Sequence, residues 1–277
     1  MNTTNSYFIE NGILKQLPIP GLTDVKLQVY EVLRVIDGVP LFAEDHVERL
    51  LNSCSLSGVE SPQDSSRFLD QLKILTVANR LVVGNLKIDL VVLSSGTLVW
   101  QMYQVKHQYP TADNYSVGVR CGVLRLERAN PQAKVVQQGV REQANAAIAA
   151  NNWYEVILIN TGDCVTEGSR SNVFFIKDEM VFTAPADQVL SGITRAKVID
   201  CIGSLGIQVV QQPIHLDQLA TFDAAFISGT SPKILPIAQI DGDGYSVGHP
   251  VLRQLMEAYD ALIASYIAAR QSSSAKL

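Results

Sequence analysis

The sequence lacks the short motifs of several large enzyme classes. It contains no GxxxxGK[ST] phosphate loop, no GxSxG nucleophile elbow and no HExxH zinc motif. Its four cysteines form no CxxC pair, and its four histidines show no metal-ligand spacing. Hydride transfer, ATP chemistry and zinc hydrolysis therefore lose support, and we expect neither a metal site nor a dithiol redox centre.

Long apolar runs and an excess of basic charge are also absent. No segment approaches the roughly 18 apolar residues that a membrane helix needs, and the polar start, Met1–Ser6, lacks a secretion pattern. The net charge of −5 argues against a general nucleic-acid binder. Dispersed cysteines are typical of a reducing compartment, so we expect a cytoplasmic protein without membrane or nucleic-acid partners. A peroxisomal address at Ala275–Leu277 is the alternative.

What the chain does have is enough sequence for about two globular domains. It has 277 residues, of which 47% are hydrophobic. Mixed strand and helix patterns predict an α/β (α+β) protein. A polar stretch that contains Pro110 separates two such regions. We therefore expect a small N-terminal domain at 1–106, an interdomain loop at 107–115 and a larger C-terminal domain at 116–277.

Periodicity predicts the elements that carry the polar motifs. Alternating apolar and β-branched residues predict a strand at 27–35, and Asp45 is expected to cap the helix that follows. A hairpin is expected at 86–93 and 97–105. Further along we expect strands at 116–125, 155–160, 173–177, 180–183, 208–212 and 224–228, and helices at 64–78, 136–150, 194–205 and 250–270.

Three polar blocks suggest a cofactor with a ring nitrogen and a phosphate. Glu167 lies in the block Val165–Ile176, and alone it would be read as a solvated loop residue. The block Ser191–Arg195 opens a helix, whose unpaired N–H groups attract anions. The block Ser228–Lys233 ends a strand and adds a hydroxyl. Because Arg49 adds a planar cation, these groups together suit pyridoxal 5'-phosphate.

These blocks, in this order, resemble the fold-type IV (class IV) pyridoxal-phosphate enzymes. That family includes branched-chain aminotransferases, D-amino-acid transaminases, R-selective amine transaminases and aminodeoxychorismate lyases. The resemblance runs from about Gln28 to Tyr259, and its early part includes Val29–Val35 and His46–Leu50. It implies a small N-terminal and a larger C-terminal α/β domain with the active site between them. It also implies a homodimer, for which the sequence offers no separate argument.

The resemblance implies that Lys134 forms the Schiff base with the cofactor. In the family this lysine stands just before a helix, about 20 residues ahead of a Tyr-Glu pair. Lys134 lies 20 residues before Tyr154 and 33 residues before Glu167. Lys233 is the alternative among ten lysines, but it follows a proline beside the expected phosphate site. Lys197 falls in the first turn of a helix, where exposure is the default.

The resemblance also assigns the cofactor contacts. Glu167 is expected to pair with the pyridine nitrogen and keep it protonated, so that the ring accepts electrons when the substrate loses its α-proton. Lys134 then moves that proton as a general acid and base. The remaining implied contacts are Arg49, Gly192, Ile193, Thr194 and Thr230 at the phosphate, Arg170 as an assisting residue with solvent exposure as its alternative, and Gln138 in place of the family's usual tyrosine.

Four residues are expected at the substrate. Tyr30 and Arg34 share one strand face by period-two geometry, and Tyr30 matches the family's carboxylate-contacting tyrosine. Lys87 stands where relatives place an arginine or tyrosine, and Ser231 offers an N–H group. For Arg34 and Lys87 a structural ion pair is the alternative.

The predicted reaction is transfer of an amino group from an amino acid, of D- or branched-chain type, to a 2-oxo acid. A lyase that releases pyruvate and 4-aminobenzoate from 4-amino-4-deoxychorismate is the alternative, and an inert relative is a third reading. The chain departs from the family in Thr23–Gln28, where many relatives are glycine-rich, and in the missing Arg/His pair of D-amino-acid transaminases. The donor and its chirality therefore stay open.

Overall fold

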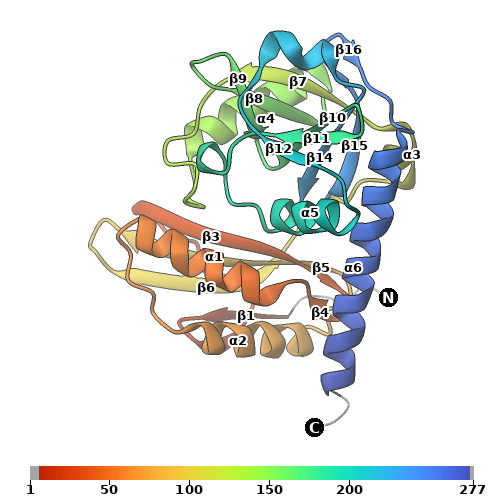
Figure 1. The fold of residues 1–277 in the computed structure, drawn as a ribbon. Helices are drawn as coiled ribbons and strands as arrows, with labels where there is room; N and C mark the ends of the chain where they lie inside the picture. Colours follow the sequence, from red (N-terminus) through yellow and green to blue (C-terminus); the bar gives the residue numbers. More distant parts are fainter. Residues whose placement is uncertain (1–5, 275–277) are drawn as a thin grey trace. The chain divides into compact units, whose positions relative to one another are not determined.

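The computed structural model describes residues 6–274 and divides into two compact units (Figure 1). Unit 1 takes the described residues of Met1–Gln108, Ala133–Val136 and Ile263–Leu277, and unit 2 takes Tyr109–Gln132 and Gln137–Leu262. The segment that carries Lys134 therefore groups with the N-terminal residues, whereas the predicted boundaries placed it in the C-terminal domain. The tripeptide considered as a peroxisomal address lies outside the described residues.

Within residues 6–274, unit 1 contains a six-stranded antiparallel sheet in the order β2-β1-β6-β5-β3-β4, with α1 and α2 packed on one face (Figure 1). The strands are β1 (Tyr7–Glu10), β2 (Ile13–Gln16), β3 (Val25–Ile36), β4 (Val39–Pro40), β5 (Gly84–Leu93) and β6 (Leu98–Val105), and the helices are α1 (Ala43–Leu56) and α2 (Ser65–Ala78).

Strand β3 carries two of the predicted substrate residues, Tyr30 and Arg34. Glu31, Leu33 and Val35 are fully buried, and the two apolar ones belong to the core beneath the helices. Tyr30 and Arg34 alternate with them and so lie on the other face. The predicted strand at 27–35 is confirmed, and it extends to Val25–Ile36.

The helices of unit 1 begin in different ways. Asp64 caps α2 by accepting a hydrogen bond from the N–H of Arg67 at 2.9 Å, in line with the predicted start. The predicted cap Asp45 is wrong, because α1 already begins at Ala43 and Asp45 lies in its first turn. Phe42, in the left-handed conformation with φ 50°, precedes this helix instead. Acidic residues in the first turn still stabilise a helix, because their negative charge interacts favourably with the helix dipole.

Unit 2 contains a ten-stranded mixed sheet within the described residues, in the order β12-β11-β10-β14-β15-β7-β8-β9-β13, with β16 beside β15. β7 pairs in parallel with both β8 and β15, and β11 with β12. The strands are β7 (Val119–Arg125), β8 (Glu155–Ile159), β9 (Cys164–Gly168), β10 (Asn172–Lys177), β11 (Met180–Thr183), β12 (Val209–Gln211), β13 (Ile214–His215), β14 (Ala224–Gly229), β15 (Lys233–Ile240) and β16 (Asp243–Gly244).

The helices of unit 2 refine the predicted boundaries. The predicted strand at 116–125 starts only at Val119, because a capping box between Thr111 and Asn114 nucleates a short helix first. The helix predicted from 136 begins at Gln138. The helices are α3 (Ala112–Val117), α4 (Gln138–Asn151), η1 (Ala186–Gln188), α5 (Ile193–Ser204), η2 (Leu216–Thr221) and α6 (Pro250–Ser274), of which α6 continues into unit 1 from Ile263.

Over the described part of the chain, none of the helices combines the length and the apolar character needed to cross a membrane.

Candidate active site

The backbone of Lys134 is fixed against strand β3. Its carbonyl accepts a hydrogen bond from the N–H of Tyr30 at 3.0 Å, and the N–H of Val136 donates to the carbonyl of Gln28 at 3.0 Å. An isolated antiparallel bridge joins Val29 to Val135 between these bonds. Lys134 thus stands just before α4, where the sequence predicts the family's lysine.

The side chain of Lys134 lies over an aromatic ring. Its Nζ is 4.8 Å from the centroid of Tyr30, and Tyr30 is only 9% exposed. A cation above an aromatic face is attracted by the ring's quadrupole. On the helix side, the N–H of Lys134 donates to Ser53 Oγ at 3.1 Å. Ser53 is a residue that the sequence reasoning missed.

Arg49 belongs to a buried ionic group on the helix-covered face of the sheet. Its Nε donates to Glu31 Oε2 at 2.9 Å and its Nη2 to Oε1 at 2.7 Å. His46 Nδ1 lies 3.1 Å from the same Oε1. Burial raises the pKa of Glu31, but the charge of Arg49, together with the contact from His46, outweighs it and holds that pKa well below its usual value. Burial in turn lowers the pKa of His46, which favours the neutral imidazole at pH 7.

Lys87 lies in a polar network on the opposite face of the sheet. Its Nζ is 2.7 Å from Asp89 Oδ2, which also accepts a hydrogen bond from the hydroxyl of Tyr103 at 2.5 Å. Gln28 Nε2 donates to Asp89 Oδ1 at 2.8 Å. Burial and the charge of Asp89 raise the pKa of Tyr103. The predicted substrate residue Lys87 is therefore ion-paired, and its Nζ lies 5.5 Å from the centroid of Tyr30.

Glu167 is a buried carboxylate on β9, with 3% of its surface exposed. Arg128 Nε lies 3.2 Å from its Oε1. The N–H of Leu190 donates to Oε2 at 3.2 Å, and Asn172 Nδ2 to the same oxygen at 3.5 Å. The alternative interpretation of Glu167 as a solvated loop residue is wrong. The residue lies on a strand, and the next strand and the loop before α5 enclose it.

A second buried carboxylate holds the turn that follows Glu167. Glu155 accepts hydrogen bonds from Ser169 Oγ at 2.5 Å and Ser171 Oγ at 3.0 Å, and from the N–H of Arg170 at 3.1 Å. The side chain of Arg170 is exposed and donates to Asn145. Arg170 is therefore exposed to solvent, as the alternative interpretation of this residue expects.

The start of α5 offers backbone N–H groups without a capping side chain. Gly192 is the N-cap, and a Cβ there would lie 2.0 Å from Asn172 Oδ1, so only glycine allows this approach. Thr194 in the first turn is 6% exposed. Thr230 and Ser231, both half-buried, lie in the turn between β14 and β15. The fully buried Ser228 Oγ just before them has no hydrogen-bond partner within the described residues.

The other predicted residues lie in less enclosed positions. Gln138 is exposed in the first turn of α4 and donates to Glu142 Oε1 at 2.8 Å. Lys233, the alternative Schiff-base lysine, is ion-paired with Asp260. That pair occupies the amine of Lys233.

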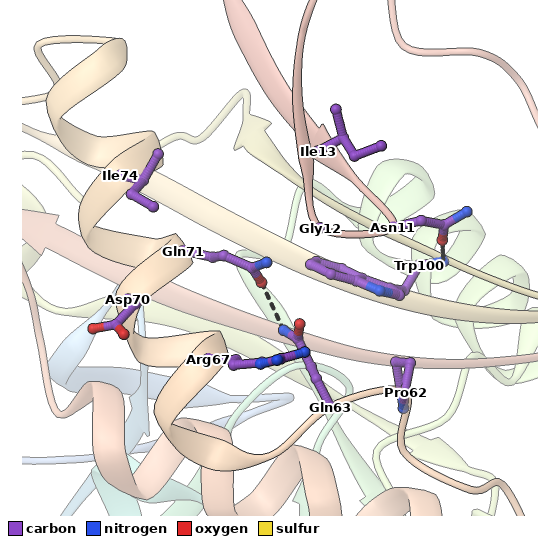
Figure 2. Close-up of a pocket in the computed structure, with 10 residues that line it drawn as sticks. All are labelled: Asn11, Gly12, Ile13, Pro62, Gln63, Arg67, Asp70, Gln71, Ile74 and Trp100. Atoms are coloured by element: carbon purple, nitrogen blue, oxygen red, sulfur yellow. Dashed lines mark hydrogen bonds between the residues drawn. The ribbon is translucent and has the colours of Figure 1, made fainter.

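A cavity of about 460 Å³ lies elsewhere in unit 1 (Figure 2). It contains none of the predicted site residues, and a hydrogen bond of 2.6 Å from Gln63 to Gln71 spans its polar side. Its lining residues are Asn11, Gly12, Ile13, Pro62, Gln63, Arg67, Asp70, Gln71, Ile74 and Trp100.

Comparison with known proteins identifies the family. The sequence model described as "Amino-transferase class IV" matches residues 28–240, which is most of the chain. The chain belongs to the class IV aminotransferase family. A protein of Methanocaldococcus jannaschii named "Putative branched-chain-amino-acid aminotransferase" is 30% identical over 77% of this chain and 78% of its own length. A D-alanine aminotransferase of Bacillus licheniformis is 27% identical over 80% and 82%.

Solved structures share the fold of this class IV aminotransferase. The branched-chain amino acid aminotransferase from Escherichia coli has a TM-score of 0.83 at 21% identity and covers 94% of this chain and 95% of its own. A Legionella pneumophila protein named "Putative 4-amino-4-deoxychorismate lyase" has a TM-score of 0.79 at 24% identity and covers 89% of this chain and 96% of its own. The predicted fold-type IV architecture is confirmed.

The residues present fit the cofactor on which class IV aminotransferases depend, pyridoxal 5'-phosphate. Lys134 supplies an amine above an aromatic ring, and Glu167 supplies a buried carboxylate. The start of α5, where Gly192 is the N-cap and no side chain caps the helix, has backbone N–H groups of the kind that bind anions. An amine, a carboxylate and an anion site are what the aldehyde, ring nitrogen and phosphate of this cofactor require.

Sequence reasoning missed several residues that contact predicted ones, among them Asp89, Arg128 and Ser53. Asp89 follows Lys87 by two positions, so strand periodicity alone places it on the same face. Arg128 and Ser53 carry no such local signal, because they lie 39 and 81 residues from the partners Glu167 and Lys134.

Proposed function

We propose that this enzyme is a pyridoxal-phosphate-dependent aminotransferase that moves an amino group from an amino acid to a 2-oxo acid. The observation that carries the proposal is the placement of Lys134. Its backbone is fixed to β3, and its amine lies over the ring of Tyr30. A lysine in a class IV aminotransferase needs this ordered position, because its amine must both attach the cofactor and transfer a proton.

Pyridoxal phosphate supplies an aldehyde that binds amines and a ring that takes up electrons when a bound substrate loses its α-proton. Lys134 would attach the cofactor through its amine, and the same amine, once displaced by a substrate amine, would serve as the general base and then the general acid that moves the α-proton.

Glu167 would keep a proton on the ring nitrogen, because its buried carboxylate would pair with that nitrogen. Arg128 lies beside Glu167 and offsets the cost of burying its charge. A protonated ring nitrogen attracts the electrons that the departing α-proton leaves behind.

The start of α5 would hold the phosphate, because the backbone N–H groups of Ile193 and Thr194 beside the N-cap Gly192 have no capping side chain there. We propose Thr230 and the guanidinium of Arg49 as further phosphate contacts. Gln138 and Arg170, both exposed, contribute less.

For the substrate, we propose contacts from Tyr30, Arg34, Lys87 and Ser231. Donors of the branched-chain or D-amino-acid type are proposed, because relatives of both names match most of the chain. The likeness to a lyase concerns the fold alone at 24% identity.

The visible spectrum of the purified protein with pyridoxal phosphate tests the proposal. A yellow band that bleaches with one donor among D-alanine, L-leucine, L-glutamate and an R-amine, and returns with a 2-oxo acid, is expected. A band that no donor bleaches contradicts transamination, and release of 4-aminobenzoate from aminodeoxychorismate would then assign the lyase reaction. Absence of any band contradicts the cofactor assignment.

We also propose a cytoplasmic homodimer. All four cysteines are buried thiols without disulfides, which suits a reducing compartment. Neighbouring apolar side chains such as Ile13 with Leu14, and Val82 with Val83, are 40–61% exposed in unit 1 and suit burial against a second copy. Light scattering should give twice 30.3 kDa, and a monomer would contradict the dimer. Recovery of a tagged copy with organelles would contradict the compartment.

A further inference from the structure

Ser53 on helix α1 contacts the proposed cofactor lysine. Its side chain is fully buried. Ser53 Oγ accepts a hydrogen bond from the N–H of Lys134 at 3.1 Å and donates its own proton to the carbonyl of Arg49 at 2.8 Å. A hydroxyl has one proton and two lone pairs, so both bonds form at once.

We propose that Ser53 is a positioning residue that holds Lys134 in place for attachment of the cofactor. The inference rests on the proposed role of Lys134. The contact that Ser53 makes is with the backbone N–H of Lys134, so it acts through the backbone of the lysine.

Both polar backbone groups of Lys134 are bound, each by a different element. Strand β3 donates to the carbonyl through the N–H of Tyr30, and helix α1 accepts from the N–H through Ser53. Removing Ser53 Oγ leaves that N–H without its acceptor in a half-buried segment, a loss that proteins generally avoid. The segment 133–136 would then lose its bond to α1 and keep its bonds to β3, and the amine of Lys134 would sample more orientations.

Ser53 also links Lys134 to Arg49. It lies one helical turn after Arg49 and binds that residue's carbonyl, while the guanidinium of Arg49 is fixed to Glu31 on β3. Glu31 directly follows Tyr30, the residue that holds the other side of Lys134. The hydroxyl of Ser53 therefore connects Lys134 with Arg49, the arginine that we propose binds the phosphate, and helps to hold the two residues in a fixed arrangement.

A hydroxyl on α2 provides the matched control. Thr76 is 5% exposed and donates to the carbonyl of Leu72 at 2.7 Å, the same bond to the residue four positions earlier that Ser53 makes. This bond of its hydroxyl lies within its own helix. Ser53 and Thr76 therefore share the structural role of a buried hydroxyl that bonds within its own helix. Ser53 differs in that it also contacts Lys134.

The experiment compares cofactor capture by apoprotein of wild type, Ser53→Ala, Ser53→Cys and Thr76→Val. Growth of the visible band after mixing with pyridoxal phosphate gives the capture rate, and a pH titration of that band gives its midpoint. Borohydride reduction and peptide mass spectrometry identify the modified lysine. Thermal unfolding reports the structural cost of each substitution.

We expect Ser53→Ala to slow capture by about tenfold, the order expected when one buried hydrogen bond is lost, and to shift the pH midpoint. Thr76→Val should lose similar thermal stability with unchanged capture rate and midpoint. Ser53→Cys keeps a group at the Oγ position, although a somewhat larger one, and replaces a strong acceptor by a weak one, so it should lie between wild type and Ser53→Ala. If Ser53→Ala does not fold, Ser53→Cys tests the positioning role of Ser53 in its place.

Two failures are distinguishable. If wild type is not modified at Lys134, the proposed function fails. If wild type is modified there and folded Ser53 variants match it in rate and midpoint, or Thr76→Val slows capture equally, the positioning role is overturned.

Discussion

Two glutamates are buried to a similar degree, Glu31 in unit 1 and Glu167 in unit 2, but their surroundings differ. Glu31 is gripped by Arg49 through bonds of 2.7 and 2.9 Å, with His46 at 3.1 Å. Glu167 is held by contacts of 3.2 to 3.5 Å from a guanidinium, an amide and a backbone N–H. Short, charge-matched contacts suit a structural anchor, whereas the looser set around Glu167 suits a carboxylate that shares its charge with a ligand.

The largest difference is expected in stability, on Glu31→Gln. Removing one charge of a buried pair leaves Arg49 without its counterion, which costs about 3 kcal/mol or more of unfolding free energy. Urea unfolding of the apoprotein measures it. Glu167→Gln, followed in the same way, should lose clearly less, and equal losses would erase the distinction between the two carboxylates.

Catalytic activity should fall more in Glu167→Gln than in Glu31→Gln, the reverse of the order expected for stability. Glu167→Gln is expected to retain the cofactor but to slow α-proton removal by about 100-fold, because a neutral amide does not keep the ring nitrogen protonated. Single-turnover bleaching of the visible band by the best donor measures this rate. An unchanged rate would remove Glu167 from the mechanism and leave it as a second structural carboxylate.

Acid is expected to act on unit 1 through His46. Its pKa is lowered in the fold, so below about pH 6.5, the usual value for histidine, the unfolded chain binds more protons and stability falls. Glu31 also has a lowered pKa, and its contribution persists down to about pH 4.3 before declining in stronger acid. Unfolding free energies at a series of pH values should fall more steeply in wild type than in His46→Asn. Parallel curves would contradict a buried neutral histidine.

The smallest effect is expected at Arg170, whose side chain is exposed beside Asn145. Arg170→Ala should change turnover less than twofold and stability by less than about 0.5 kcal/mol. Arg128→Ala, which removes the cation beside Glu167, is the matched comparison and should cost more in both. A tenfold loss of turnover at Arg170 would place its guanidinium at the cofactor after all.

These contrasts also show how far sequence reasoning reached. Strand alternation placed Tyr30 and Arg34 on one face, and the helix pattern placed Lys134 just before α4, because both are local properties of the chain. Partners of the predicted residues were not found where they come from distant segments. Ser53 meets Lys134 across 81 residues, and only the packing of α1 beside β3 creates that contact.

Some helix starts and helix caps were also not predicted correctly from the sequence. Asp45 carries the residue type of a helix cap, yet the helix starts two residues earlier, because Phe42 in the left-handed conformation turns the chain first. Gly192 shows the opposite case, where a residue without a capping side chain starts helix α5 and leaves room for Asn172.

The grouping of Ala133–Val136 with unit 1 has a consequence for synthesis on the ribosome. A nascent chain that has emerged only as far as Gln108 contains Tyr30, Arg49 and Ser53, but the segment that docks on them is still missing. The N-terminal sheet must therefore wait for about 25 further residues before Tyr30 finds its acceptor, a few seconds at ordinary elongation rates. For the same reason, cutting the gene after Gln108 would yield a fragment that never acquires its lysine.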